Sequence, residues 1–287
     1  MALVHSLWTA PMLNNERGQA SKKQIESTVW CFASSVAYAK RLGENIHLYA
    51  DSYGRELLDF LPYNKIKELK VDPKTPTYFW AAGKFYALME MELGDIHIDG
   101  DVFLKTPEIM EVIRNGLYQS DLIVQSIENS WIYENEYYIK CLDIIKENNI
   151  QLPNNYPDYH PAFNCGLVGF NNQEFKDKYI ANYLESIKAI SNNDDAANKI
   201  INSKDIWMDL LIEQQHLFSM AEKCDYTVCN LLGEGDSVYI NADILGYQHL
   251  LGPDKWEQLD KIKKQLYLLD RNIYNAVAAH LNQILHD

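Results

Sequence analysis

The 287-residue sequence contains no run of about eighteen apolar residues, which a membrane-spanning helix would require. The opening MALVHSLWTA does not join a basic segment to a long apolar one, so we expect no secretory signal. Cysteine is scarce, and the five cysteines include no CxxC pair, which argues against a structural zinc site or a disulfide framework. These absences predict a cytoplasmic protein without a transmembrane segment.

Positive charge is also in short supply. The chain has 26 lysines and arginines against 40 aspartates and glutamates, a formal net charge of -14. Such a charge repels the phosphate backbone of nucleic acids, so we expect no nucleic-acid partner. Hydrophobic residues, at 47%, are abundant enough for a large core, and the 12% of aromatic residues favours surfaces on which sugars or bases stack. The composition leaves the oligomeric state open.

In the first part of the chain, segments with the periodicity of a strand alternate with segments that have the periodicity of a helix. Alternation of short strand-like runs with helical patterns implies βαβ units and a mainly parallel sheet. The predicted strands are residues 3–9, 45–51 and 66–71, and the predicted helices are residues 23–42, 53–61 and 79–93. A further strand-like segment, DIHIDGDVFL, occupies residues 95–104.

The later part of the chain is richer in helical patterns. Strands are predicted at residues 121–127 and 162–170, and helices at residues 138–148, 173–190 and 205–223, with a polar linker at 191–197. Residues 253–287 form an amphipathic pattern typical of a C-terminal helical extension. We therefore predict an α/β, Rossmann-like single domain over residues 1–252, with a mixed central sheet flanked by helices.

An acidic pair follows an apolar strand-like segment. Asp99 and Asp101 stand where ligands bind in open α/β sheets, and Gly100 between them would let the backbone bend so that both face one ion. Carboxylate oxygens suit Mg²⁺ or Mn²⁺, which bridge to phosphate oxygens. Two acids at a strand end can also be plain surface charges. An EF-hand loop beginning at Asp95 is excluded, because its twelfth position is Thr106 instead of a glutamate.

A second motif lies near the carboxyl end, in the segment HLLGPDKW. It contains His249, Gly252 and Lys255: an imidazole that can complete a metal site, a glycine that permits close approach to phosphate, and a cation. A histidine followed by glycine and lysine is weak evidence by itself. Together with the upstream acidic pair it indicates a site for a metal-bound phosphate.

These two motifs resemble those of the family 8 retaining glycosyltransferases, which combine a strand ending in DxD with a late HxxGxxKPW. The segment FNCGLVGFN at residues 163–171 also looks like that family's FNAGVLLIN strand. The resemblance implies a GT-A fold, with a nucleotide-sugar-binding half at about residues 1–105 and an acceptor-side half at about 106–252. It implies transfer of a sugar from a nucleotide-sugar, typically a UDP-hexose, to a glycan or other small acceptor.

The resemblance also implies roles for individual residues. Asp99, Asp101 and His249 would bind Mn²⁺ or Mg²⁺, and Gly252 with Lys255 would hold the diphosphate. It implies that the donor is contacted by Thr9, Ala10, Lys84 and Gly100. It also implies that the transferred sugar or acceptor is flanked by Asn164, Cys165 and Gly166, and that Glu213 and Gln214 lie beneath the sugar.

The sequence departs from the family pattern at two places. No proline separates Lys255 from Trp256, and the family's DQD appears as Glu213, Gln214 and Gln215. Whether the anomeric configuration is retained is therefore open. Because consecutive helical residues point in different directions, we expect only one of Glu213 and Gln214 in the cleft.

Three further interpretations stay open at the sequence level. Asp99 could be the nucleophile of a haloacid-dehalogenase-like phosphatase, although that motif normally follows the first strand. The chain could also be a GT-A-like scaffold that binds a glycan without transferring it. Aromatic residues could form an acceptor platform or a packed loop; they are Trp131, Tyr133, Tyr137 and Tyr138.

Overall fold

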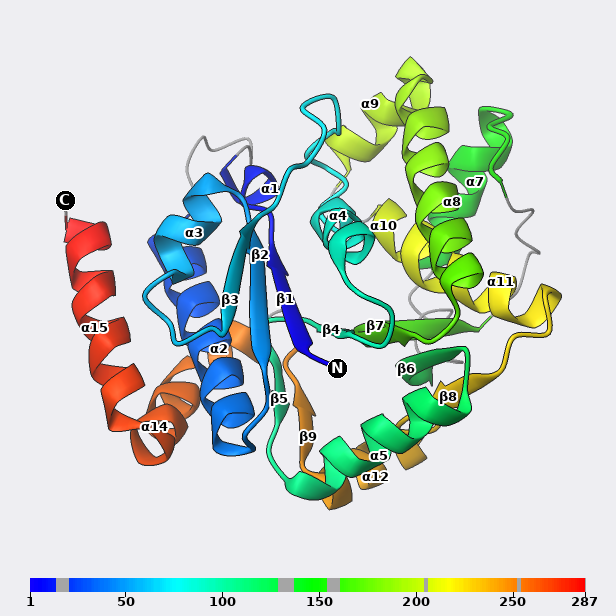
Figure 1. Ribbon diagram of the computed structural model, residues 1–287. Helices are drawn as coiled ribbons and strands as arrows, with labels where there is room; N and C mark the ends of the chain where they lie inside the picture. The colour runs from blue at the N-terminus through cyan, green and yellow to red at the C-terminus, as the bar shows by residue number, and fades with distance from the viewer. Residues whose placement is uncertain (14–20, 129–136, 154–160, 204–205, 252–253, 287) are drawn as a thin grey trace.

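A seven-stranded mixed sheet forms the centre of the computed structural model, which describes residues 1–13, 21–128, 137–153, 161–203, 206–251 and 254–286 (Figure 1). The strands from β3 to β4 are mutually parallel, and β7 runs antiparallel to both of its neighbours. The order across the sheet is β3 (Lys65–Glu68), β2 (Ile46–Ala50), β1 (Leu3–Leu7), β4 (Ile96–Ile98), β7 (Ala162–Phe170), β6 (Leu122–Glu128) and β8 (Val228–Asn230). The predicted α/β class with a mixed sheet is confirmed.

The strand order reverses between β1 and β4. Leu3 in β1 lies opposite both Ile46 of β2 and Ile96 of β4, so β1 has a parallel neighbour on each side. The chain runs outward from β1 to β2 and β3 and then returns past β1 to form β4. Such a reversal leaves a crevice at the carboxyl ends of the two central strands, where ligands bind in open α/β sheets.

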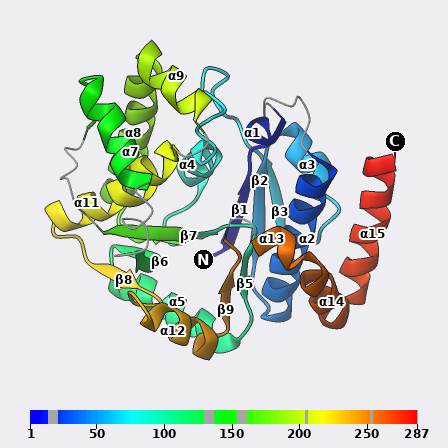
Figure 2. The same cartoon turned by 180° about the vertical axis from the view of Figure 1, so that it is seen from behind.

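Helices cover both faces of the sheet (Figures 1 and 2). Leu3 and Val4 are consecutive on β1 and belong to two different hydrophobic clusters, as the alternation of side chains along a strand requires. Beside Leu3 are α2 (Lys22–Arg41), α3 (Ser52–Leu58) and α5 (Pro107–Gln119). Beside Val4 are α4 (Ala82–Glu90), α7 (Tyr137–Glu147), α8 (Gln173–Ser191) and α9 (Asp194–Asn202).

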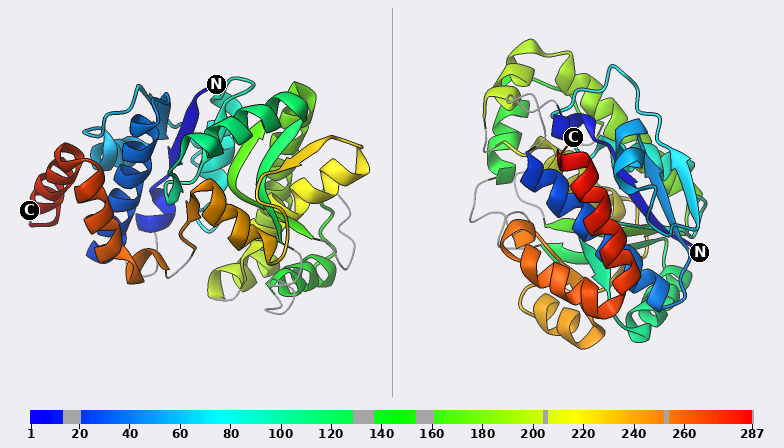
Figure 3. Two further views of the ribbon diagram at one scale, coloured as in Figure 1. Left: turned by 90° about the horizontal axis from the view of Figure 1, so that it is seen from below. Right: turned by 90° about the vertical axis from the view of Figure 1, so that its left-hand side faces the viewer.

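The carboxyl-terminal segment is helical, as predicted. It forms α13 (Asp254–Glu257), α14 (Leu259–Leu269) and α15 (Arg271–His286), and the last two pack against α2 (Figure 3). Their apolar faces join the same hydrophobic cluster as α2, so these helices complete the core on that side of the sheet. The buried positions are Leu259, Ile262, Leu266, Ile273, Val277 and Leu281.

Several short elements differ from the prediction. The linker expected at residues 191–197 is wrong, because Asn193 caps α9 and starts a new helix directly after α8. The helix expected at 205–223 is divided into α10 (Met208–Leu210), a π-helical turn η1 (Leu211–Gln215) and α11 (His216–Lys223). In the segment 95–104, β4 ends at the acidic pair as expected, and a second strand that was not predicted, β5 (Val102–Leu104), follows the loop. In the part of the chain that the structure describes, no helix could cross a lipid bilayer.

Candidate metal and nucleotide site

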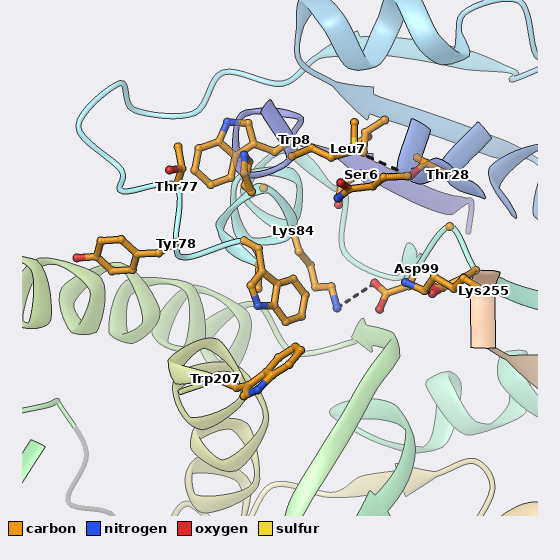
Figure 4. Close-up of a pocket in the computed structure, with 18 of the residues that line it drawn as sticks. Ser6, Leu7, Trp8, Thr28, Thr77, Tyr78, Lys84, Asp99, Trp207 and Lys255 are labelled. Atoms are coloured by element: carbon orange, nitrogen blue, oxygen red, sulfur yellow. Dashed lines mark hydrogen bonds and ion pairs between the residues drawn. The ribbon is translucent and has the colours of Figure 1, made fainter. Parts of the chain in front are cut away.

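A cleft of about 860 Å³ opens at the carboxyl ends of β1 and β4 (Figure 4). Its volume falls in the range of about 300–1,000 Å³ that small-molecule sites occupy. The end of β1, the first half of α2 and the loop before α4 form its walls, together with α9 and α10. Its charged lining residues are Lys84, Asp99, Asp101 and Lys255. The cleft therefore combines the topological position of a ligand site with both signs of charge.

Asp99, Asp101 and His249 converge beside this cleft. Each offers one ligand atom, and the three atoms lie within 4.8 Å of one another. The convergence follows from a two-stranded ladder that β5 makes with β9 (Tyr247–His249), in which Val102 lies opposite His249. This pairing brings a residue from the carboxyl-terminal part of the chain beside the acidic pair, as the resemblance implied.

The ring of His249 is held in the orientation that a metal ligand requires. Its Nδ1 lies 2.8 Å from Oε1 of Gln125, and the hydroxyl of Tyr247 donates to the same oxygen at 2.7 Å. Because a carbonyl oxygen only accepts, Nδ1 carries the proton and Nε2 presents a lone pair. That Nε2 lies 3.6 Å from Oδ1 of Asp101. Two electron-rich atoms facing each other at this distance fit a cation between them.

Gly166 makes room for this arrangement. A Cβ atom at this position of β7 would lie 2.4 Å from Cε1 of His249 and 2.5 Å from Oε1 of Gln125. Any larger residue would displace the imidazole. Gly166 was predicted to flank a sugar or acceptor, and in the structure it lies against the ring of His249.

Asp101 is buried and compensated by two partners. Its Oδ2 lies 2.5 Å from Nζ of Lys255, and its Oδ1 faces His249. Burial alone would raise the pKa of Asp101, but Lys255, and His249 when its ring is protonated, hold the pKa well below its usual range. Asp101 is therefore an anion over the whole physiological pH range.

Lys84 is the buried counterpart on the other side of the acidic pair. Its ammonium group lies 3.0 Å from Asp99 Oδ1 and donates to Glu213 Oε1 at 2.7 Å and to the carbonyl oxygen of Cys165 at 2.9 Å. Burial alone would lower the pKa of Lys84, but the two carboxylates raise it further than burial lowers it. Figure 4 shows this side chain reaching toward Asp99. Lys84 thus links α4, the acidic pair and η1.

Gly100 lies in a turn, in which the backbone N–H of Val102 donates to the carbonyl oxygen of Asp99 at 3.0 Å. The backbone thus bends between the two acids, as expected, without a left-handed conformation at the glycine. A Cβ atom at Gly100 would lie 2.1 Å from the ring of Phe32. The glycine therefore also allows α2 to pack against the acidic loop.

The sequence profile of one known family matches residues 1–280. The chain belongs to DUF6734, a family of unknown function. No curated protein matches the sequence at a significant level. For this DUF6734 protein, arguments about activity therefore start from the geometry of the cleft.

Other residues expected in the site have structural partners. Thr9 is buried, and its backbone and hydroxyl both donate to the carboxylate of Asp51, which also caps α3. Ala10 begins the short helix α1 (Ala10–Leu13), and neither residue lines the cleft. The thiol of Cys165 is buried, and burial raises its pKa well above its ordinary value, which disfavours a nucleophilic thiolate.

Glu213 and Gln214 point in different directions, as expected. Glu213 is buried against Lys84, and burial raises its pKa. Gln214 accepts a hydrogen bond from the hydroxyl of Tyr138 on α7 at 3.2 Å. Neither lines the cleft, although one of the two was expected there. Gly252, Trp131 and Tyr133 lie outside the described residues, as does the side chain of Tyr137.

Sequence reasoning missed several polar residues around the site. Gln125 lies in the middle of β6 and orients the ring of His249. A polar residue in this strand becomes informative only once the bounds of the strand are known. Glu128 accepts a hydrogen bond at 2.6 Å from Asn164, which was predicted, and burial raises the pKa of Glu128. His97 on β4 lies 2.8 Å from the hydroxyl of Ser6, which lines the cleft. Each of these residues is polar at a position where the strand pattern favours an apolar side chain.

Proposed function

We propose that this DUF6734 protein is a metal-dependent glycosyltransferase of GT-A architecture that acts in the cytoplasm on a nucleotide-sugar, typically a UDP-hexose. The convergence of Asp99, Asp101 and the Nε2 lone pair of His249 beside the switch-point cleft carries this proposal. Two carboxylates and one imidazole fit Mn²⁺ or Mg²⁺ with coordination positions left for phosphate oxygens. The resemblance to family 8 glycosyltransferases supports the same assignment.

The charges of the site suit a diphosphate leaving group. In sugar transfer, the bond from the anomeric carbon to the diphosphate oxygen breaks, a bond to the acceptor hydroxyl oxygen forms, and the hydroxyl proton passes to the departing diphosphate or to water. The departing diphosphate gains negative charge, which a bound cation and Lys255 would neutralise. Lys255 is suited to this because its side chain is 39% exposed and lines the cleft.

The buried partners would keep the site in place during this reaction. Lys84 fixes Asp99 from beneath, and Gln125 fixes the tautomer of His249. Preorganised groups of this kind stabilise developing charge without having to move. Asp99 is already engaged by Lys84, which disfavours its use as a free nucleophile of a phosphatase.

A thermal-shift experiment tests the proposal. Melting temperatures would be measured for the whole protein with Mn²⁺ alone, UDP alone, both together, and a series of nucleotide-sugars with Mn²⁺. A ligand that binds only the folded state raises the melting temperature, and we expect a rise with UDP that requires Mn²⁺. Asp101→Asn should abolish the rise, whereas Asp59→Asn, an exposed acid at the end of α3, should retain it.

Two outcomes would reject the proposal. The first is the absence of any nucleotide-dependent shift in the presence of Mn²⁺, which favours a glycan-binding scaffold. The second is release of phosphate from a generic phosphomonoester at a rate that UDP does not change, which favours a phosphatase.

A further inference from the structure

The cleft has a second end that the metal site does not use. This end is lined by the loop before α4, with Thr77, Tyr78 and Trp80, and by α9 and α10, with Ile201 and Trp207. Figure 4 places Thr77 and Tyr78 across the cavity from Asp99 and Lys255, with Trp207 below Lys84. We call these five residues the aromatic end of the cleft.

The aromatic end is apolar and accessible. Trp80 is 44% exposed and Trp207 is 43% exposed, so both present indole surface to the cavity they line. Among the described residues that line the cleft, the only lysines are Lys84 and Lys255, and both contact the acidic pair. The five residues of the aromatic end carry no charge, and the hydroxyl of Tyr78 donates to Ser191 at 3.4 Å.

A buried network holds the two tryptophan-bearing segments together. Asp209 accepts a hydrogen bond from the backbone N–H of Ala81, the residue after Trp80, at 3.1 Å. The same carboxylate accepts from the hydroxyl of Tyr183 at 2.6 Å, and Asp209 is two residues beyond Trp207. The loop before α4 and the helix α10 are thus joined through one buried side chain. The indoles are therefore carried by fixed backbone, which lowers the entropy lost when a ligand binds.

The other end of the cleft suits the nucleotide. The carboxyl end of β1 and the neighbouring first half of α2 lie at the strand-order reversal, where nucleotides bind in open α/β sheets. With the diphosphate at the metal, a nucleoside lying along β1 leaves the aromatic end free for the second substrate.

Resting on the proposed function, we infer that the aromatic end binds the acceptor, and that the acceptor is an uncharged glycan with a pyranose ring against Trp80 and Trp207. A pyranose has an apolar C–H face that packs on an indole and a rim of uncharged hydroxyl groups. The net charge of -14 and the absence of a lysine or arginine among the described residues of this end disfavour a phosphorylated or uronic acceptor.

Calorimetry with defined sugars tests this inference. The whole protein, saturated with UDP and Mn²⁺, would be titrated with lactose, maltose and cellobiose as neutral glycans, with glucose 6-phosphate as an anionic probe, and with n-octyl glucoside as a lipid-like probe. We expect at least one neutral disaccharide to bind and glucose 6-phosphate not to bind. Trp80→Ala and Trp207→Ala should each weaken disaccharide binding about tenfold and leave UDP affinity unchanged.

Tyr118→Ala is the matched control, because Tyr118 is an aromatic residue that is 85% exposed on α5 and does not line the cleft. It should leave disaccharide binding unchanged. The inference is overturned if UDP and Mn²⁺ bind but no neutral disaccharide does, or if only n-octyl glucoside binds. It is also overturned if the tryptophan variants weaken UDP binding instead of disaccharide binding, which would place the nucleobase there. Failure of UDP and Mn²⁺ to bind the wild-type protein would instead reject the proposed function.

Discussion

The two lysines beside the acidic pair are held in opposite ways. Lys84 lies beneath Asp99 with its side chain only 7% exposed, and its ammonium group has three partners within 3.0 Å. Lys255 comes from α13, its side chain is 39% exposed, and it reaches Asp101 across the cleft. The ammonium group of Lys84 is enclosed by protein groups, whereas that of Lys255 is partly exposed at the cleft.

The largest expected effect comes from removing the buried charge. Lys84→Met leaves the buried carboxylate of Glu213 without its cation, so we expect the free energy of unfolding to fall by about 3–5 kcal/mol. Denaturant unfolding monitored by circular dichroism measures the change. The double variant Lys84→Met with Glu213→Gln should recover part of the loss. If the loss of unfolding free energy in the double variant equals the sum of the losses in the two single variants, Lys84 and Glu213 are not coupled, and the contrast between the two lysines fails.

A second prediction concerns the buried acid that supports the aromatic end. Burial raises the pKa of Asp209 from 3.8 to about 7. Between about pH 4 and pH 7 the folded protein keeps a proton that the unfolded chain has released, so this contribution to stability is complete below pH 4 and lost as pH rises to 7. The loss should be on the order of 3 kcal/mol. Chemical unfolding measured across this pH range should show that the free energy of unfolding depends less on pH in Asp209→Asn than in the wild-type protein. An unchanged dependence on pH would contradict the raised pKa of Asp209.

A third prediction tests whether β7 sets the position of the imidazole. Gly166→Ala places a methyl group 2.4 Å from the ring of His249, and overpacking of this kind costs about 1–3 kcal/mol. We also expect Mn²⁺ affinity to fall at least tenfold, since the displaced ring no longer faces Asp101. Gly116→Ala is the matched control, because its Cβ would lie 2.4 Å from Sγ of Cys229, away from the metal site. Equal losses of Mn²⁺ affinity in both variants would count against a local effect.

The smallest change in stability is expected on the open side. Lys255→Met should lower the free energy of unfolding by about 1–2 kcal/mol, less than Lys84→Met, because buried Asp101 loses its cation but keeps His249 as a partner. It should nevertheless weaken UDP binding about tenfold in calorimetry, because it removes the cation nearest the proposed diphosphate. If Lys255→Met instead unfolds the protein as readily as Lys84→Met, the contrast between the two lysines disappears.

Much of the parallel half of the sheet could be predicted from the sequence. β1, β2 and β4 are short apolar runs separated by helical patterns, and that alternation predicts their parallel pairing but not their order in the sheet. Asp99 and Asp101 are neighbours in sequence, so local pattern was enough to select them. The match of the late motif then predicted that His249 would join them, and the described geometry agrees.

The features of the fold and the site that were not predicted depend on contacts between distant segments, which no local sequence pattern encodes. β5 and β9 contain three residues each, too few for a periodicity, and they are defined only by pairing with each other. The position of Glu213 follows from a π-helical turn, which changes the direction of each side chain relative to an α-helix. The role of Gly100 depends on Phe32, a residue of α2 that is distant in sequence.

The central claim is that Asp99, Asp101 and His249 hold a divalent cation against a nucleotide diphosphate. Electron paramagnetic resonance of free Mn²⁺ in titrations with and without UDP measures this binding directly. The account predicts that UDP tightens Mn²⁺ binding by the wild-type protein, and that Asp101→Asn and His249→Ala each weaken the binding at least tenfold. Unchanged Mn²⁺ affinity in both variants, with the fold intact by circular dichroism, would contradict it.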